Sequence, residues 1–188
     1  MKTTLHFTCI IMIAGLLVSG CGNSRGLIAK ASIESKQDVF TDVLGKDALS
    51  GKATADIKFS VKSNSSRFLW FYNKHTDPFY TVHLSIDGQA TVLESEPILE
   101  DISPIDANVP ESGKGWKYQF SKRVVLTPGK HKLTIALPVD EVIVEKEIVL
   151  REGANTIIIK PIYKSTLLRP YKGENFKAGV KSVEVLLN

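Results

Sequence analysis

Apolar and polar side chains alternate along most of the chain after residue 52. In the segment 53–61 every second residue is apolar, and mostly polar residues stand between them (Ala55, Ile57, Phe59 and Val61 against Asp56, Lys58 and Ser60). The same alternation runs through 80–86, 131–137 and 183–187. A period of two places successive side chains on opposite faces of a strand, whereas an amphipathic helix needs a period of about 3.6. The sequence therefore predicts a fold of half-buried β-strands.

Turn-forming residues separate these segments. Asp87-Gly88 follows the strand 80–86 and predicts a tight hairpin with a return strand over 89–93. Thr127-Pro128-Gly129-Lys130 has proline in its second position and glycine in its third, as a type II turn requires. These residues predict antiparallel pairing between neighbouring strands.

Three other segments are expected to form strands. The aromatic run 68–72 predicts a strand that is buried on both faces. The segments 142–150 and 155–163 are predicted to pair with each other across 151–154. Trp116, Tyr118 and Phe120 are expected on one face of a further strand.

About eight to ten short strands, with no long amphipathic helix, indicate an antiparallel sandwich or barrel. We favour an immunoglobulin-like β-sandwich, because residues that discourage strand edges from pairing with other chains recur along the strands (Lys58, Lys117, Lys122, Lys132, Pro138 and Pro161). The polar segment 94–115 is expected to be a long surface loop, since it carries three prolines (Pro97, Pro104 and Pro110). Residues 27–49 contain a short element, either a helix or a strand around 39–43, that packs on the edge of the domain.

The chain begins with an uncharged apolar run, Leu5–Val18, behind a single lysine. As a helix this run would rise about 21 Å, at ~1.5 Å per residue, which is less than the roughly 30 Å of a bilayer core. The small residues Ser19 and Gly20 follow, as signal peptidases require. We therefore expect a cleaved signal peptide over 1–20 and not a transmembrane helix.

Val18-Ser19-Gly20-Cys21 resembles the lipobox of bacterial lipoproteins. The resemblance implies that Cys21 is the first mature residue and carries lipid that holds the protein at the membrane. The alternative is an ordinary signal peptide with a cysteine nearby by chance. By the same resemblance, Gly22 in place of aspartate implies sorting to the outer membrane, facing the periplasm. The expected organisation is a signal peptide (1–20), an acylated cysteine with a tether and the edge element (21–52), and a sandwich domain (53–188).

The hairpin Val124–Ile135, with Pro128-Gly129-Lys130-His131 at its turn, resembles that of PEGA-type domains of bacterial envelope proteins. Gly51-Lys52-Ala53, Leu84–Gly88 and Leu150–Gly153 occur in the matching order. The resemblance implies a PEGA-like sandwich without a known activity. The long interval between Gly88 and Pro128 departs from a compact PEGA-type repeat.

The sequence offers little for catalysis. His75, Asp77 and His83 could together hold a metal, but His83 alternates away from the apolar face of 80–86 and is expected to face solvent. His131 shares the apolar face of 131–137 and is expected to bond a turn carbonyl. The acidic residues of the loop are interpreted as solvated side chains and not as a glycosidase pair (Glu94, Glu96, Glu100, Asp101 and Asp106). We expect no enzyme, no metal and no cofactor.

The net charge and the aromatic residues indicate what kind of partner the domain could bind. The 24 basic and 20 acidic residues are interspersed, and the net charge of +4 does not favour nucleic acid. About half of the aromatic residues between 68 and 80 should face outward and form a binding platform with residues from nearby (Trp70, Tyr72, His75, Asp77 and Trp116). The expected function is a non-catalytic interaction or structural module with an envelope protein partner. The alternative is a glycan- or peptidoglycan-binding module that uses this platform.

Overall fold

The computed structural model of the protein describes residues 37–43, 50–64, 80–165 and 174–188. Its elements, in chain order, are β1 (Phe40–Asp42), β2 (Ala53–Asn64), β3 (Val82–Ile86), β4 (Gln89–Leu93), β5 (Ile98–Ile102), β6 (Gly113–Leu126), β7 (Gly129–Leu137), β8 (Val142–Leu150), β9 (Gly153–Tyr163), the 3-10 helix η1 (Asn175–Ala178) and β10 (Val180–Leu187). The expected all-β fold is confirmed. Within the described residues no helix is long and apolar enough to cross a membrane.

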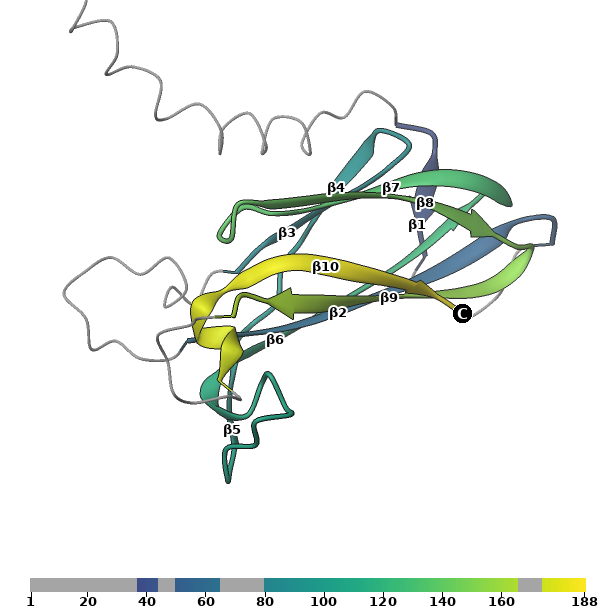
Figure 1. Cartoon of the computed structure of the whole chain (residues 1–188). Helices are drawn as coiled ribbons and strands as arrows, with labels where there is room; N and C mark the ends of the chain where they lie inside the picture. The colour runs from purple at the N-terminus through teal and green to yellow at the C-terminus, as the bar shows by residue number, and fades with distance from the viewer. Residues whose placement is uncertain (1–36, 44–49, 65–79, 166–173) are drawn as a thin grey trace, which may run out of the picture.

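The strands form two sheets that pack face to face, as Figure 1 shows. The six-stranded sheet has the order β1-β6-β2-β9-β10. Its sixth strand, β5, pairs with the first residues of β6, whereas β1 pairs with the last ones. The four-stranded sheet has the order β4-β3-β7-β8. The architecture is a β-sandwich, as the sequence predicts.

The alternating residues of β2 show how the core is built. Ala55, Ile57 and Phe59 are buried between the sheets, while Lys58 faces outward. Opposite β2, Phe120 of β6 pairs with Phe59 and their rings stack with centroids 5.8 Å apart. Burial of such apolar surface at about 25 cal/mol per Å² is the main stabilising contribution of a core of this kind.

Of the two predicted hairpins, the one across Asp87-Gly88 is present. The hairpin predicted across 127–130 is wrong, because β6 and β7 lie in different sheets and do not pair. β3 and β4 pair across Asp87 and Gly88, whose φ angles of 49° and 93° are the positive values that a two-residue hairpin turn needs. At the end of β6, Gly129 has a φ of 135° and opens β7. Residues of β7 then alternate inward as expected, so that Leu133, Ile135 and Leu137 are buried.

The predicted pairing of 142–150 with 155–163 is wrong. β8 pairs with β7 in the four-stranded sheet, whereas β9 lies between β2 and β10 in the six-stranded sheet. The residues between β8 and β9 therefore carry the chain from one sheet to the other. β9 also runs parallel to β2, with Ala53 opposite Gly153 and Phe59 opposite Ile159. The sandwich is thus antiparallel except at this central pair.

The prediction of one long loop over 94–115 is also wrong. Ile98–Ile102 forms β5 and pairs antiparallel with the first residues of β6, which begins at Gly113. The irregular part of the segment is confined to the residues before β5 and to the connection 103–112.

The edge element expected within 27–49 includes a strand. β1 pairs with the end of β6, and Phe40 of β1 is buried. The side chain of Gln89 on β4 accepts hydrogen bonds from the backbone N–H groups of Val39 and Phe40 and donates one to the Phe40 carbonyl. Gln89 therefore joins the edges of the two sheets. The aromatic run 68–72 lies outside the described residues.

The residues taken to protect strand edges mostly lie inside the sheets. Lys58 is on the central strand β2, and Lys132 is on β7 between β3 and β8. Pro161 is tolerated in β9 because the pairing of β9 with β2 ends at Ile159. These lysines and prolines therefore do not mark the edges of the sheets, although the sandwich itself is present.

Candidate functional site

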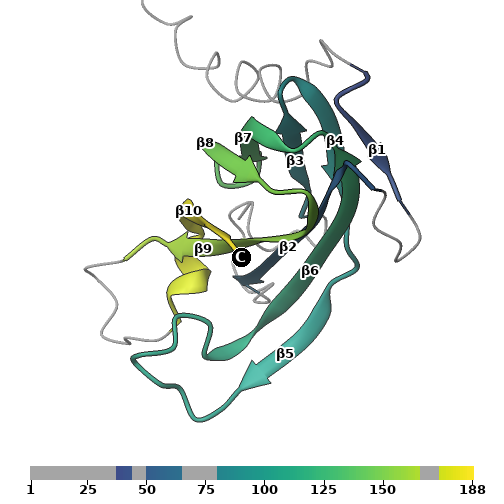
Figure 2. The same ribbon diagram turned by 90° about the vertical axis from the view of Figure 1, so that its right-hand side faces the viewer.

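Strand β5 exposes apolar side chains on both of its faces. Ile98, Leu99 and Ile102 are 60%, 48% and 37% exposed, and the connection after β5 adds Ile105 and Val109. Among the described strands β5 pairs with β6 alone, so its outer backbone edge is open. Figure 2 shows β5 at the margin of the curved sheet, away from the four-stranded layer. We call these five residues and the β5 backbone the β5 ribbon.

A buried lysine fastens the β5 ribbon to the sheet. Lys62 of β2 has a fully buried side chain, and its Nζ donates to the carbonyl oxygens of Glu111 at 2.8 Å and Gly113 at 2.6 Å. The same Nζ lies 3.1 Å from Oε2 of Glu100 on β5 and 5.1 Å from the ring centre of Phe176 on η1. A buried ammonium requires such partners, since an unpaired charge is costly away from water. Lys62 thus ties three separate parts of the chain to the outer face of β2.

Glu111 extends this cluster on its other side. Its carboxylate accepts a hydrogen bond from the Tyr163 hydroxyl and forms an ion pair with Lys117. The Tyr163 oxygen in turn accepts the backbone N–H of Lys62 at 2.9 Å. Burial, and then the Glu111 charge, raise the pKa of Tyr163 above its ordinary value, so the phenol stays protonated and serves as a donor.

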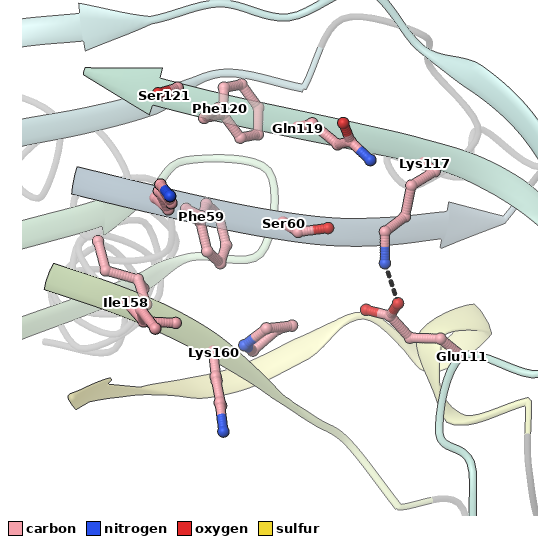
Figure 3. Close-up of a pocket in the computed structure, with 12 residues that line it drawn as sticks. Phe59, Ser60, Glu111, Lys117, Gln119, Phe120, Ser121, Ile158 and Lys160 are labelled. Atoms are coloured by element: carbon pink, nitrogen blue, oxygen red, sulfur yellow. Dashed lines mark hydrogen bonds and ion pairs between the residues drawn. The ribbon is translucent and has the colours of Figure 1, made fainter. Parts of the chain in front are cut away.

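Beside this cluster a groove of about 580 Å³ runs over the outer face of β6, β2 and β9. Figure 3 shows it with Lys117 and Glu111 at one end. The lining combines apolar surface, including that of Ile158 and Pro161, with several polar side chains (Lys58, Ser60, Lys117, Gln119, Ser121 and Lys160). The volume lies within the ~300–1,000 Å³ of ordinary ligand sites. The strand register explains the grouping, because Lys58 lies opposite Ser121 on β6 and Ile158 on β9.

The histidine–carboxylate pair in the described part of the chain holds two turns together. His131 has one ring nitrogen, Nδ1, 2.7 Å from Oδ2 of Asp87 and the other, Nε2, 2.8 Å from the carbonyl oxygen of Thr127. The predicted bond to a turn carbonyl is therefore confirmed, and Asp87 is a second partner. Because both ring nitrogens are engaged by the protein, this imidazole is not placed to act as a general base.

His83 is more covered than expected. It is half-buried on β3, between Val92 and Ala136 of the neighbouring strands, and burial lowers the pKa of its imidazole. Within the described residues no cluster of three or more histidine, cysteine, aspartate or glutamate side chains could hold a metal ion.

The buried carboxylate of Asp140 has a structural role of the same kind. Asp140 accepts the Tyr80 hydroxyl at 2.5 Å and the backbone N–H of Val180 at 2.9 Å. Burial, with the Asp140 charge beside it, raises the pKa of Tyr80 well above its ordinary value. The pair links the start of β3 to β10 across the sandwich.

The predicted platform residues are only partly within the described chain. Cys21, Trp70, Tyr72, His75 and Asp77 lie outside the described residues. Trp116 lies on β6 opposite Ser63 and Leu99, half-buried and packed against the core.

The sequence did not point to β5, to Lys62 or to the groove. Lys62 occupies an outward position of an alternating strand, where a solvated lysine is the ordinary expectation. The nearest indication of β5 is its group of three apolar residues among the acidic residues of 94–106. No protein-family model matches the chain, and no curated protein sequence matches it.

Proposed function

We propose that the chain is a lipid-anchored envelope protein whose sandwich is a non-catalytic interaction module. The observation that carries the proposal is the β5 ribbon, which leaves apolar side chains and an open strand edge in water. Exposed apolar edges are avoided in proteins that remain free, because they pair with other chains. We infer that a partner covers this edge.

The partner is inferred to be an extended protein segment that adds a strand to β5. In this mode backbone hydrogen bonds supply affinity, and alternate side chains supply specificity. Asp101 lies on β5 among these apolar residues, and Glu96 lies just before the strand, so the matching segment alternates apolar and basic residues. A second copy of the chain fits less well, since antiparallel pairing centred on Glu100 would place the two Glu100 side chains opposite each other.

Binding of a defined peptide tests this proposal. A fluorescent peptide of alternating valine and lysine should raise its anisotropy when the full chain is added, whereas one of valine and glutamate should not. The double variant Ile98→Lys, Ile102→Lys should weaken binding about tenfold or more, because hot-spot residues contribute ≥2 kcal/mol. Val149→Lys is the matched control, because Val149 is 51% exposed on the edge strand β8 of the other sheet.

Equal peptide binding by the double variant and by the control would contradict the proposal that β5 is the docking edge. Sedimentation of the full chain supplies a second readout. A dimer that the double variant dissociates would replace the peptide partner with a second copy of the chain.

Lipid anchorage is tested separately. Cys21→Ser should abolish metabolic labelling with palmitate and release the protein from membranes. Cys9→Ser is the control and should leave both unchanged, since Cys9 belongs to the proposed signal peptide. Continued labelling of the Cys21→Ser protein would exclude this anchor.

A further inference from the structure

We infer that the groove on the outer face of the six-stranded sheet is a second binding site, and that it takes an acidic saccharide. The inference does not depend on the β5 ribbon. It rests on the charge, the hydrogen-bonding groups and the apolar surface that the groove brings together.

The groove carries more positive than negative charge. It contains Lys58, Lys117 and Lys160, and Glu111 is its one carboxylate. Glu111 is already engaged by Lys117 and by the Tyr163 hydroxyl. Within the described residues no carboxylate lies within ion-pair distance of Lys58 or Lys160, so both ammonium groups can meet a ligand.

The acidic residues near the groove do not cancel these charges. Asp56 forms two hydrogen bonds with the guanidinium of Arg123, although its field also acts on Lys58. Glu184 of β10 lies opposite Lys160 in the strand register. Asp56 and Glu111 are thus paired with Arg123 and Lys117. The remaining charges are those of Lys58 and Lys160, which face one carboxylate, that of Glu184. An anionic group is therefore favoured between Lys58 and Lys160.

Neutral hydrogen-bonding groups lie between the lysines. The side chains of Ser60, Gln119 and Ser121 point into the groove and form no hydrogen bond with other described residues. Hydroxyl and amide groups donate and accept, which suits ligand hydroxyls. Ile158 and Pro161 add an apolar surface against which the face of a sugar ring can lie.

The same lining distinguishes a saccharide from a nucleic acid. Single-stranded nucleic acids bind through bases that stack on exposed aromatic rings. The aromatic residues at this groove, Phe59 and Phe120, are only 2% and 3% exposed, because their rings point into the core. A chain of sugar rings that carry carboxylates fits the groove better than a polynucleotide.

Calorimetric titration of the full-length chain in detergent tests the inference. An oligogalacturonate is the probe, and its methyl ester is the matched control that keeps the rings but removes the charge. The acid should bind, and added salt should weaken the binding. The affinity for the ester should be lower by about tenfold or more, because the ester cannot form charge-assisted hydrogen bonds with Lys58 and Lys160.

Two pairs of variants locate the site. Lys58→Gln with Lys160→Gln should weaken binding of the acid about tenfold or more. Lys130→Gln with Lys132→Gln changes the net charge equally, but these lysines form ion pairs on the other sheet, and binding should be unchanged. Lys58→Arg with Lys160→Arg retains both charges and should retain binding, which separates loss of charge from loss of folding.

Several outcomes would overturn the inference. They are no binding of the acid at millimolar concentration, equal binding of the ester, and equal losses in the two glutamine pairs. Displacement of the oligomer by equimolar inorganic phosphate would indicate a simple anion site. Equal affinity for single-stranded DNA would indicate nonspecific polyanion binding.

Discussion

Lys62 lies across the space that a side chain at Gly115 would occupy. A Cβ atom at Gly115 would be 2.9 Å from Cε of Lys62, 2.6 Å from the ring of Phe176 and 2.6 Å from the backbone oxygen of Ser63. Because Gly115 has no side chain, β6 leaves room at this position for the lysine that fastens the β5 ribbon.

Gly115→Ala should lower the free energy of unfolding by about 1–3 kcal/mol, because overpacking against a fixed backbone oxygen cannot be relieved by a rotamer change. Urea denaturation of the full chain measures this effect. Ser121→Ala, at an exposed position of the same strand, should change stability by less than about 0.5 kcal/mol. An equally small change in the free energy of unfolding for Gly115→Ala would mean that β2 shifts at Ser63 and accommodates the methyl group.

Lys62→Met should destabilise the fold by about 3 kcal/mol, because it leaves the Glu111 and Gly113 carbonyls and the Glu100 carboxylate without their cation. The connection 103–112 should also be cleaved faster by a protease. Lys58→Met is the control, since Lys58 lies four residues earlier on the same face of β2 but is exposed. Similar denaturation midpoints for the two variants would show that the buried lysine is dispensable.

The Asp56–Arg123 pair predicts a dependence of stability on pH. The hydrogen bond from Arg123 holds the pKa of Asp56 below its ordinary value of 3.8. Since the folded-state pKa is the lower one, the pair stabilises the fold fully above the unfolded value and loses this contribution as pH falls through the folded pKa. The wild type should therefore exceed Asp56→Asn in stability at pH 7, and the gap should shrink below about pH 4. A gap that is constant with pH would exclude this ionisation as its source.

The His131–Asp87 contact should show energetic coupling. His131→Leu fills a similar space but removes the ring contacts with the Thr127 carbonyl and with Oδ2 of Asp87, while the backbone N–H of Lys132 still donates to Oδ1 of Asp87. Asp87→Asn retains a residue that tolerates the positive φ at this position. A double-mutant cycle with these substitutions should give a coupling of about 1–2 kcal/mol. Additive effects would mean that the two turns are held by other contacts.

The strands were predictable because their alternation is local. Each residue of β2 or β7 shows in the sequence which face it takes, and Asp87-Gly88 fixes its own hairpin. The partner of each strand is not local information. Residues 151–154 look like a hairpin turn, yet Asn155 donates to the carbonyl oxygens of Arg151 and Thr54 and anchors the chain as it crosses to the other sheet.

The site was less predictable than the fold for a related reason. The sequence places Lys62 on an outward face, but the residues that cover it come from Glu100, Glu111 and Phe176, which are distant in the chain. The lining of the groove is set by the register of three strands. Neither relationship is visible in a short window of sequence.

The parallel pairing of β2 with β9 has a consequence for how the chain folds. The two strands meet across a long separation, as the bond between Asn155 and Thr54, 101 positions apart, illustrates. Until the ribosome has added β9, β2 lacks one of its two neighbours, and the six-stranded sheet cannot close. Contacts of such high sequence separation slow folding, because the cost of closing the loop precedes the gain from pairing. For a nascent chain of this design, the six-stranded sheet is therefore expected to be completed only when nearly all of the chain has been synthesised.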